Sequence, residues 1–334
     1  MPVTKIMEMR QASDILPGQV SGRKDAPGFG HVLASAFSCV WIVLRDLSVL
    51  FRLPVSLMVG ASTAFGALLA RPRLDGPWPE AALAAMLLAW GCSAWNQTQE
   101  RRADALMERT ARRPLAAGRM PAPSGVMLGA GCVLGACAML HSLGGAPLAV
   151  LGLGIALVYN GIYTPLKKRT AFALLAGAAV GATPPLVGWL AVGGGLDDPL
   201  LALIYGLYAF WQIPHFWLRA GKRAGEYRRA GFVLPVFAGF TGTRGRLLEI
   251  WFCAFATALL MLPALPLFQS LFFRLAAAAA GLLALGGAGI VFRLRERYGM
   301  EKATGPAIAL VDGCLMLCML LLVADALLAP VVSR

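Results

Sequence analysis

Three oxygen-bearing side chains recur every four residues in one charged stretch of this sequence. Asn96, Glu100 and Asp104 lie within "WNQTQERRADALMERTARRPL" (95–115), which continues directly from an apolar run. Because successive steps of four residues on an α-helix drift by only about 40°, the three side chains should line one helical face. Two carboxylates and an amide carbonyl are hard oxygen ligands, suited to Mg²⁺ that bridges substrate phosphates. A solvated, salt-bridged helix end is the alternative interpretation.

Basic residues near these acids, in the same stretch and on other loops, favour the metal–phosphate interpretation. Arg109 and Arg113 follow at once, and guanidinium and ammonium groups bind phosphate. A second loop reads "YTPLKKRT" (163–170), and a third reads "LRAGKRAGEYRRAGFVLPV" (218–236), with Glu226 the one acid among its five basic residues. If the basic residues only set the orientation in the membrane, the acidic residues among them would have no explanation. Binding of a metal–diphosphate complex would explain both the acidic and the basic residues.

The elements that must position these residues are membrane helices. The chain has 334 residues, of which 58% are hydrophobic and 14% charged, against about 25% charged in soluble domains. Runs of about 20 apolar residues can cross a bilayer core of about 30 Å. The sequence therefore predicts an all-α integral membrane protein. Nine transmembrane helices are expected at 53–70, 79–99, 123–143, 146–163, 171–192, 199–218, 248–269, 271–292 and 304–328.

The segments before the first span and the distribution of charge set the expected topology. Residues 1–30 are expected to form a flexible arm, and 31–330 the membrane domain. Within it, 31–51 predicts an interfacial helix or a longer first span. All but four of the 30 Lys and Arg residues lie before the first span or after even-numbered spans, which predicts a cytoplasmic N-terminus. The net charge of +13 then reflects membrane orientation and not nucleic-acid binding.

Four stretches carry a resemblance to a known family. "NQTQERRADALMERTARRPLAAG" (96–118) resembles the N-x-x-x-[DE]-x-x-x-D…RT…RPL…G segment of the UbiA-type intramembrane prenyltransferases, in particular their heme-farnesylating branch. The loop 163–170, "GATPPLVGW" (181–189) and "WQIPHFWL" (211–218) resemble the same branch, and the likeness extends from about Arg52 to the last span. It implies a single nine-helix bundle around a central cavity, in a bacterial inner membrane. Two acidic motifs at its cytoplasmic mouth would hold Mg²⁺ and the diphosphate of farnesyl diphosphate.

The resemblance also implies a role for each candidate residue. The catalytic metal ligands would be Asn96, Glu100, Asp104 and, within "EYRRAGFVLP", Glu226. The diphosphate contacts would be Arg109, Arg113, Lys167 and Lys168, with Tyr163 near enough in sequence to share the pocket. His215 is the acceptor-site candidate, through heme contact or proton handling. A hydrogen bond between helices is the alternative for His215, and also for Asp312 within the last predicted span.

The implied reaction joins C1 of the farnesyl group to a vinyl group of heme b, adds water and releases diphosphate, which yields heme O for terminal oxidases. Heme A synthase and oxidase assembly proteins are candidate partners, beside the lipid bilayer itself. The second acidic motif has only one carboxylate, Glu226, because Gly225 occupies the preceding position, where an acid is common in the family. A prenyltransferase with a quinone-precursor or chlorophyll-like acceptor is the nearest alternative, and a small-molecule transporter is a more distant one.

Overall fold

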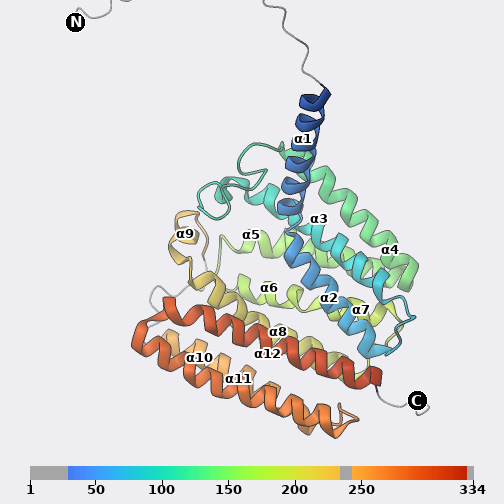
Figure 1. The fold of residues 1–334 in the computed structure, drawn as a ribbon, viewed down its shortest axis with the longest axis vertical. Coiled ribbons are helices and arrows are strands. Elements are labelled where there is room, and N and C mark those ends of the chain that lie inside the picture. Colours follow the sequence, from blue (N-terminus) through green and yellow to red (C-terminus); the bar gives the residue numbers. More distant parts are fainter. Residues whose placement is uncertain (1–28, 234–242, 329–334) are drawn as a thin grey trace, which may run out of the picture. The chain divides into compact units, whose positions relative to one another are not determined.

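The computed structural model describes residues 29–233 and 243–328, and every element within them is helical (Figure 1). Most of the predicted arm, 1–30, lies outside the described residues. The elements are α1 (Phe29–Leu50), α2 (Leu53–Ala70), α3 (Trp78–Asp104), α4 (Ala122–Leu157), the π-helix η1 (Val158–Tyr163), α5 (Thr164–Leu166), α6 (Ala173–Gly181), α7 (Thr183–Ala191), α8 (Pro199–Gly221), α9 (Ala224–Arg229), α10 (Thr243–Met261), the 3₁₀ turn η2 (Leu262–Ala264), α11 (Leu271–Tyr298) and α12 (Met300–Leu328). Contacts group the residues from Asp46 onward into one compact unit, and those before it into another.

Several helices are suited to a membrane, which makes this a multi-pass integral membrane protein. Within the described ranges, five helical stretches are long and apolar enough to cross a bilayer: Leu53–Ala70, Ala122–Leu166, Ala173–Ala191, Leu271–Tyr298 and Lys302–Leu328. The predicted spans on α3 and α8 are helical but are not in this group. The predicted span 248–269 is not in it either, because its apolar helical stretch, Leu248–Ala264, is shorter. The all-α class is therefore confirmed for the described residues, while the number nine and the cytoplasmic N-terminus stay predictions.

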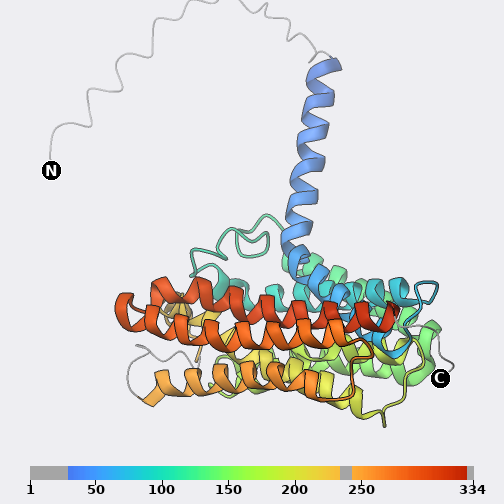
Figure 2. The same ribbon diagram turned by 60° about the horizontal axis from the view of Figure 1, so that its bottom comes forward.

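Neighbouring helices pack along their lengths in the unit that begins at Asp46. α10, α11 and α12 lie side by side, and α2 packs against α3 and α7 (Figures 1 and 2). α3 also packs against α4, and α8 contacts α6, α10 and α12. These pairings place α2, α3, α4, α6, α7 and α8 around one region, in which the candidate site lies.

Two breaks divide helices that are apolar throughout. The predicted third and fourth spans are separated at Gly144 and Gly145, and Gly145 adopts φ 68°, ψ −166°, a conformation that only glycine readily reaches. The predicted fifth span, 171–192, is two helices, α6 and α7, that meet at Ala182. Pro184 and the residue after it lack backbone N–H donors, so the hydrogen-bond ladder of α6 cannot continue through them.

The contact between α2 and α7 depends on glycine at the crossing. A Cβ atom on Gly188 of α7 would lie 1.8 Å from the backbone oxygen of Thr63 in α2. A Cβ on Gly66 of α2 would lie 2.0 Å from the backbone oxygen of Pro185. Small residues allow membrane helices to approach this closely, so that their backbones are in contact. The crossing holds α7 beside the region in which the site lies.

Gly188→Ala should strongly destabilise the protein, because the new methyl group meets a backbone oxygen that no side-chain rotation can move. Overpacking a tight core costs about 1–3 kcal/mol, and separating two helices should place this variant at or above that range. Thermal unfolding and size-exclusion chromatography in detergent measure the effect. Gly154→Ala is the matched control, because a Cβ on Gly154 of α4 meets nothing within 4 Å. Equal stability of the two variants would contradict the prediction.

Candidate functional site

The three oxygen-bearing residues of the charged stretch lie on one helix, as their spacing predicts. Asn96, Glu100 and Asp104 all belong to α3, and their exposed fractions are 0%, 5% and 1%. These side chains are not solvated, so that part of the alternative is wrong, whereas its salt bridges are present. Buried carboxylates are costly unless they are paired. The partners of these side chains therefore define the site.

Both carboxylates form buried ion pairs with bases to which the family resemblance assigns diphosphate contacts. Lys167 Nζ lies 2.6 Å from Glu100 Oε1, and Arg113 Nη1 donates to Asp104 Oδ2 at 2.7 Å. The side chains of Lys167 and Arg113 are only 12% and 11% exposed. Burial lowers the pKa of Lys167 although the Glu100 carboxylate favours its charged form, and burial likewise lowers the pKa of Arg113. Two desolvated cations are thus held beside two acids.

Arg52 is a third base at this site. Its Nη2 donates to Asn96 Oδ1 at 2.7 Å, and Asn96 Nδ2 donates in turn to Thr164 Oγ1 at 3.1 Å. Burial opposes the charge of Arg52, but Tyr159, Glu100, Asp104 and Tyr163 together outweigh burial and raise the pKa of Arg52 above its usual value. The sequence pattern does not assign Arg52 to the site. It precedes the first predicted span, where a basic residue commonly reflects membrane orientation.

The position of Arg52 follows from the turn between α1 and α2. Arg52 has φ 47° and ψ 51°, the one left-handed conformation of a non-glycine residue within the described ranges. From α3, Gln97 Nε2 and Ser93 Oγ donate to the backbone oxygen of Leu50 at 2.6 and 2.8 Å. These bonds anchor the chain two residues before Arg52. Strained backbone that the surroundings enforce is typical of functional sites.

The wide turn of η1 brings the second basic loop to α3. Tyr163, at the end of η1, is buried, and Lys167 Nζ lies 4.9 Å from its ring centroid. Gln99 Nε2 of α3 donates to the backbone oxygen of Asn160 at 3.2 Å. π-helical turns are rare in proteins overall, but those that occur often lie at functional sites. Lys168 is exposed, and its Nζ lies 5.7 Å from the ring centroid of Phe232.

The second acidic motif also reaches this region. Glu226 lies on the short helix α9, and its Oε2 accepts a long hydrogen bond, 3.5 Å, from the backbone N–H of Arg109. The backbone N–H of Val233 donates to the oxygen of Lys167 at 2.8 Å. The loops after α3, α5 and α8 therefore meet, although Leu234 and the residues after it to 242 lie outside the described residues.

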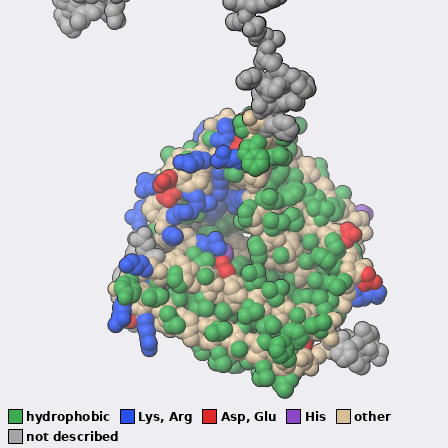
Figure 3. Space-filling model, in the orientation of Figure 1, with side chains coloured by type: hydrophobic (Ala, Val, Ile, Leu, Met, Phe, Trp, Pro, Cys, Tyr) green, Lys and Arg blue, Asp and Glu red, His purple; other side chains and the backbone are tan. Residues whose placement is uncertain are grey.

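Basic side chains gather around a hollow on the face that Figure 3 shows, on the side of α5 and α9. The exposed members from the three loops include Arg109, Arg112, Lys168, Arg169, Lys222 and Arg223. Such a concentration of one sign of charge attracts anions. Arg109 and Lys168 thus face solvent, whereas Arg113 and Lys167 are held by acids within the site.

The acids do not form a metal site by themselves. Among the residues that the structure describes, no three His, Cys, Asp or Glu side chains converge as ligands of one metal ion. The row on α3 contains only two carboxylates, and these contact different bases. The donor set still fits Mg²⁺, because it consists of hard oxygens. Moreover, Glu100 Oε1 is fully buried and makes no hydrogen bond of good geometry, although the Lys167 ammonium is close.

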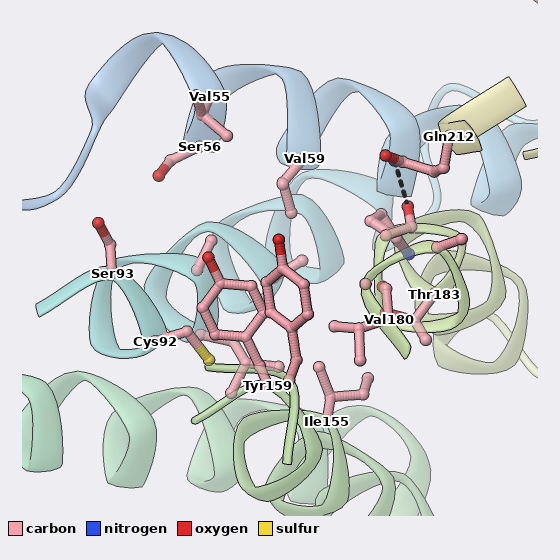
Figure 4. A pocket seen from close by; sticks show the side chains of 18 of the residues that line it. Val55, Ser56, Val59, Cys92, Ser93, Ile155, Tyr159, Val180, Thr183 and Gln212 are labelled. Carbon is pink, nitrogen blue, oxygen red and sulfur yellow. Dashed lines mark hydrogen bonds between the residues drawn. The ribbon is translucent and has the colours of Figure 1, made fainter. Parts of the chain in front are cut away.

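A cavity of about 380 Å³ adjoins these residues. Val59 of α2, Cys92 of α3, Tyr159 of η1 and Val180 of α6 contribute to its largely apolar lining (Figure 4). The three oxygen-bearing residues of α3 are not part of the lining, but Arg52 is. The cavity therefore meets the charged cluster at Arg52.

His215 of α8 lines the same cavity and is bonded to Asp312 of α12. The distance from His215 Nδ1 to Asp312 Oδ1 is 2.6 Å, and Trp211 Nε1 donates to the same oxygen at 3.2 Å. Arg219 Nη2 donates to Asp312 Oδ2 at 3.1 Å. For His215 and for Asp312, the alternative interpretation is a hydrogen bond between helices. That bond is present, and it joins these two residues to each other.

Comparisons with known proteins agree with these features. The model of the UbiA prenyltransferase family matches residues 59–311. A protoheme IX farnesyltransferase of Nitratidesulfovibrio vulgaris (strain DP4) is 43% identical over 288 residues, 86% of this chain and 97% of the relative.

Two solved structures share the fold. An apo UbiA homolog from Aeropyrum pernix K1 has a TM-score of 0.61 and 17% identity, over 79% of this chain and 97% of that one. A UbiA homolog from Archaeoglobus fulgidus bound to GPP and Mg²⁺ has a TM-score of 0.56 and 14% identity, over 82% and 99%. With a family match over most of its length, this chain belongs to the UbiA prenyltransferase family.

Proposed function

We propose that this protein transfers the farnesyl group of farnesyl diphosphate to a vinyl group of heme b, which forms heme O and releases diphosphate. The C1–O bond of the farnesyl diphosphate breaks and C1 bonds to the vinyl group. Water then supplies a hydroxyl group to the neighbouring carbon and gives up a proton. The observation that carries this proposal is the 43% identity to a relative named protoheme IX farnesyltransferase, which the chain matches over 97% of its length.

Mg²⁺ is the proposed cofactor, and it would stabilise charge on the departing diphosphate when bound. The residues proposed to hold it are Asn96, Glu100, Asp104 and Glu226. Two observations support this choice of residues. Buried side-chain oxygens line one face of α3, and the buried Oε1 of Glu100 makes no hydrogen bond of good geometry. The related fold of a homolog bound to GPP and Mg²⁺ agrees with this choice. The side chain of Glu226 is 19% exposed, and Glu226 is the one acidic residue of α9. It should therefore contribute less to metal binding than the buried residues of α3.

The buried bases are proposed to bind the diphosphate. Arg52, Arg113 and Lys167 each contact an oxygen ligand of α3. When a metal–diphosphate complex binds, the bases can exchange these oxygens for those of the diphosphate, so that no charge is left buried and unpaired. The exposed Arg109 and Lys168 then serve to attract the anion and to cover its outer side.

The cavity suits the prenyl chain and the reacting carbon. Breaking the allylic C–O bond leaves positive charge on carbon, which water would quench. Apolar residues such as Val59 and Ile155 exclude water, and the ring faces of Tyr159 and Tyr163 can stabilise a cation. The distribution of basic residues supports a site at the cytoplasmic face of the bacterial inner membrane. Heme A synthase or terminal-oxidase assembly proteins would then receive the product.

Expression of the chain in a host that makes heme b but no heme O should produce a heavier heme. The expected mass corresponds to heme b with one farnesyl group and one hydroxyl group added across a vinyl double bond, and mass spectrometry of extracted pigment measures it. Folded protein that leaves heme b unchanged, with Mg²⁺ and farnesyl diphosphate supplied, would contradict the proposal. Transfer of labelled farnesyl to a quinone precursor or a chlorophyll-like ring in the same extract would instead identify another acceptor.

A further inference from the structure

One polar cluster joins two helices at the cavity and is not explained by diphosphate binding. Asp312 of α12 accepts bonds from Trp211, His215 and Arg219, which all lie on α8. Of these, His215 lines the cavity. The acid is 97 positions from His215 in the chain, so the helical packing alone brings the two residues together.

The contact with Asp312 occupies one of the two ring nitrogens of His215, Nδ1. An ionised carboxylate can only accept hydrogen bonds, so His215 Nδ1 carries the proton that Asp312 Oδ1 accepts. Arg219 contacts the other oxygen of Asp312, so this carboxylate has a cationic partner that is independent of the imidazole. In the neutral imidazole with its proton on Nδ1, Nε2 carries the lone pair. Metal-binding histidines are commonly oriented by a carboxylate in this way.

We propose that Asp312 is a positioning residue, which holds His215 so that Nε2 can bind the iron of the heme acceptor. This inference rests on the proposed function and adds to it the contact that orients the heme. Arg52 and Tyr163 line the same cavity as His215. Iron binding at His215 would therefore anchor the heme in the cavity where the farnesyl group is released.

A second acid on α12 shows what a purely structural role looks like. Asp325 is 2% exposed, and its two oxygens accept bonds from the backbone N–H groups of Gln269 and Ser270, just before α11. It satisfies two backbone donors in the turn that leads into that helix. Asp312 differs because its bonds go to side chains, one of which borders the cavity. Asp325 is therefore the matched control.

Titration of the purified full-length protein with ferric heme b tests the proposal, with visible absorption and electron paramagnetic resonance as readouts. The wild type should show a histidine-bound spectrum. His215→Ala should lose it, and added imidazole should restore it. Asp312→Leu should weaken heme binding by roughly 10- to 100-fold, as losses of a carboxylate behind a ligating histidine do. Asp312→Asn, which keeps a hydrogen-bond acceptor, should recover most of the affinity. Asp325→Asn should leave the spectrum and affinity unchanged in the folded fraction.

The outcomes separate this inference from the proposed function. A wild-type spectrum and affinity in His215→Ala or Asp312→Leu overturns the inference, even while the wild type makes the heavier heme. A wild type that neither binds ferric heme nor makes that product overturns the inference and the proposed function together.

Discussion

Glu100→Gln should lower the rate of farnesyl transfer by roughly 10²- to 10³-fold, the usual effect of removing one group that supports transition-state charge. The substitution keeps the size of the side chain but removes the charge that would hold Mg²⁺. We therefore expect the Mg²⁺ concentration for half-maximal rate to rise at least about tenfold, since charge-assisted contacts are worth roughly 1.5–3 kcal/mol. Initial rates measured across a Mg²⁺ series with purified protein provide both values.

Lys167 complicates this experiment and supplies its control. Glu100→Gln leaves the buried ammonium of Lys167 without its acid, and breaking a buried pair can cost about 3–5 kcal/mol. The double variant Glu100→Gln/Lys167→Met removes both charges, so its thermal stability should return toward that of the wild type. Lys167→Met alone should raise the KM for farnesyl diphosphate with little change in the Mg²⁺ dependence. If the activity of Glu100→Gln falls only in proportion to its folded fraction, at an unchanged Mg²⁺ requirement, Glu100 is a structural residue.

The parts of the site that are local in sequence could be predicted from it. Asn96, Glu100 and Asp104 share a face because helical periodicity alone determines it, and α3 continues to Asp104. The break at Gly144 and Gly145 was also readable, since it separates two apolar runs. The pairing of particular acids with particular bases was not readable. Glu100 contacts Lys167 because η1 returns the chain to α3, and no sequence spacing encodes that return.

Residues missed or left ambiguous depend on distant contacts. His215 and Asp312 are both unusual in apolar helices, but the bond between them exists only because α8 packs on α12. Ala182 divides the fifth predicted span because Pro184 follows it, although the segment is apolar throughout. Arg52 is the clearest case. Its left-handed backbone is supported by Gln97 of α3 bonding to Leu50, a contact that no local pattern predicts.

Arg52→Gln should weaken inhibition by inorganic diphosphate by about 10- to 100-fold, because a hydrogen bond to a charged group is worth roughly 1.5–3 kcal/mol. The expectation follows from the placement of the guanidinium, which lines the cavity and donates to Asn96. The farnesyl-transfer rate should fall as well. Arg52→Lys should be intermediate, because an ammonium group keeps the charge but loses the planar fork that matches phosphate.

Arg71→Gln is the matched control for this variant. Arg71 follows the other end of the same helix, α2, and is exposed, so its loss should leave diphosphate inhibition unchanged. If Arg52→Gln and Arg71→Gln have equal diphosphate inhibition and equal rates per folded molecule, Arg52 only satisfies the buried Asn96 oxygen. If they differ as expected, the strained turn at Arg52 has a functional reason: it places a cation between the oxygen-bearing residues of α3 and the cavity, where the proposed reaction releases diphosphate.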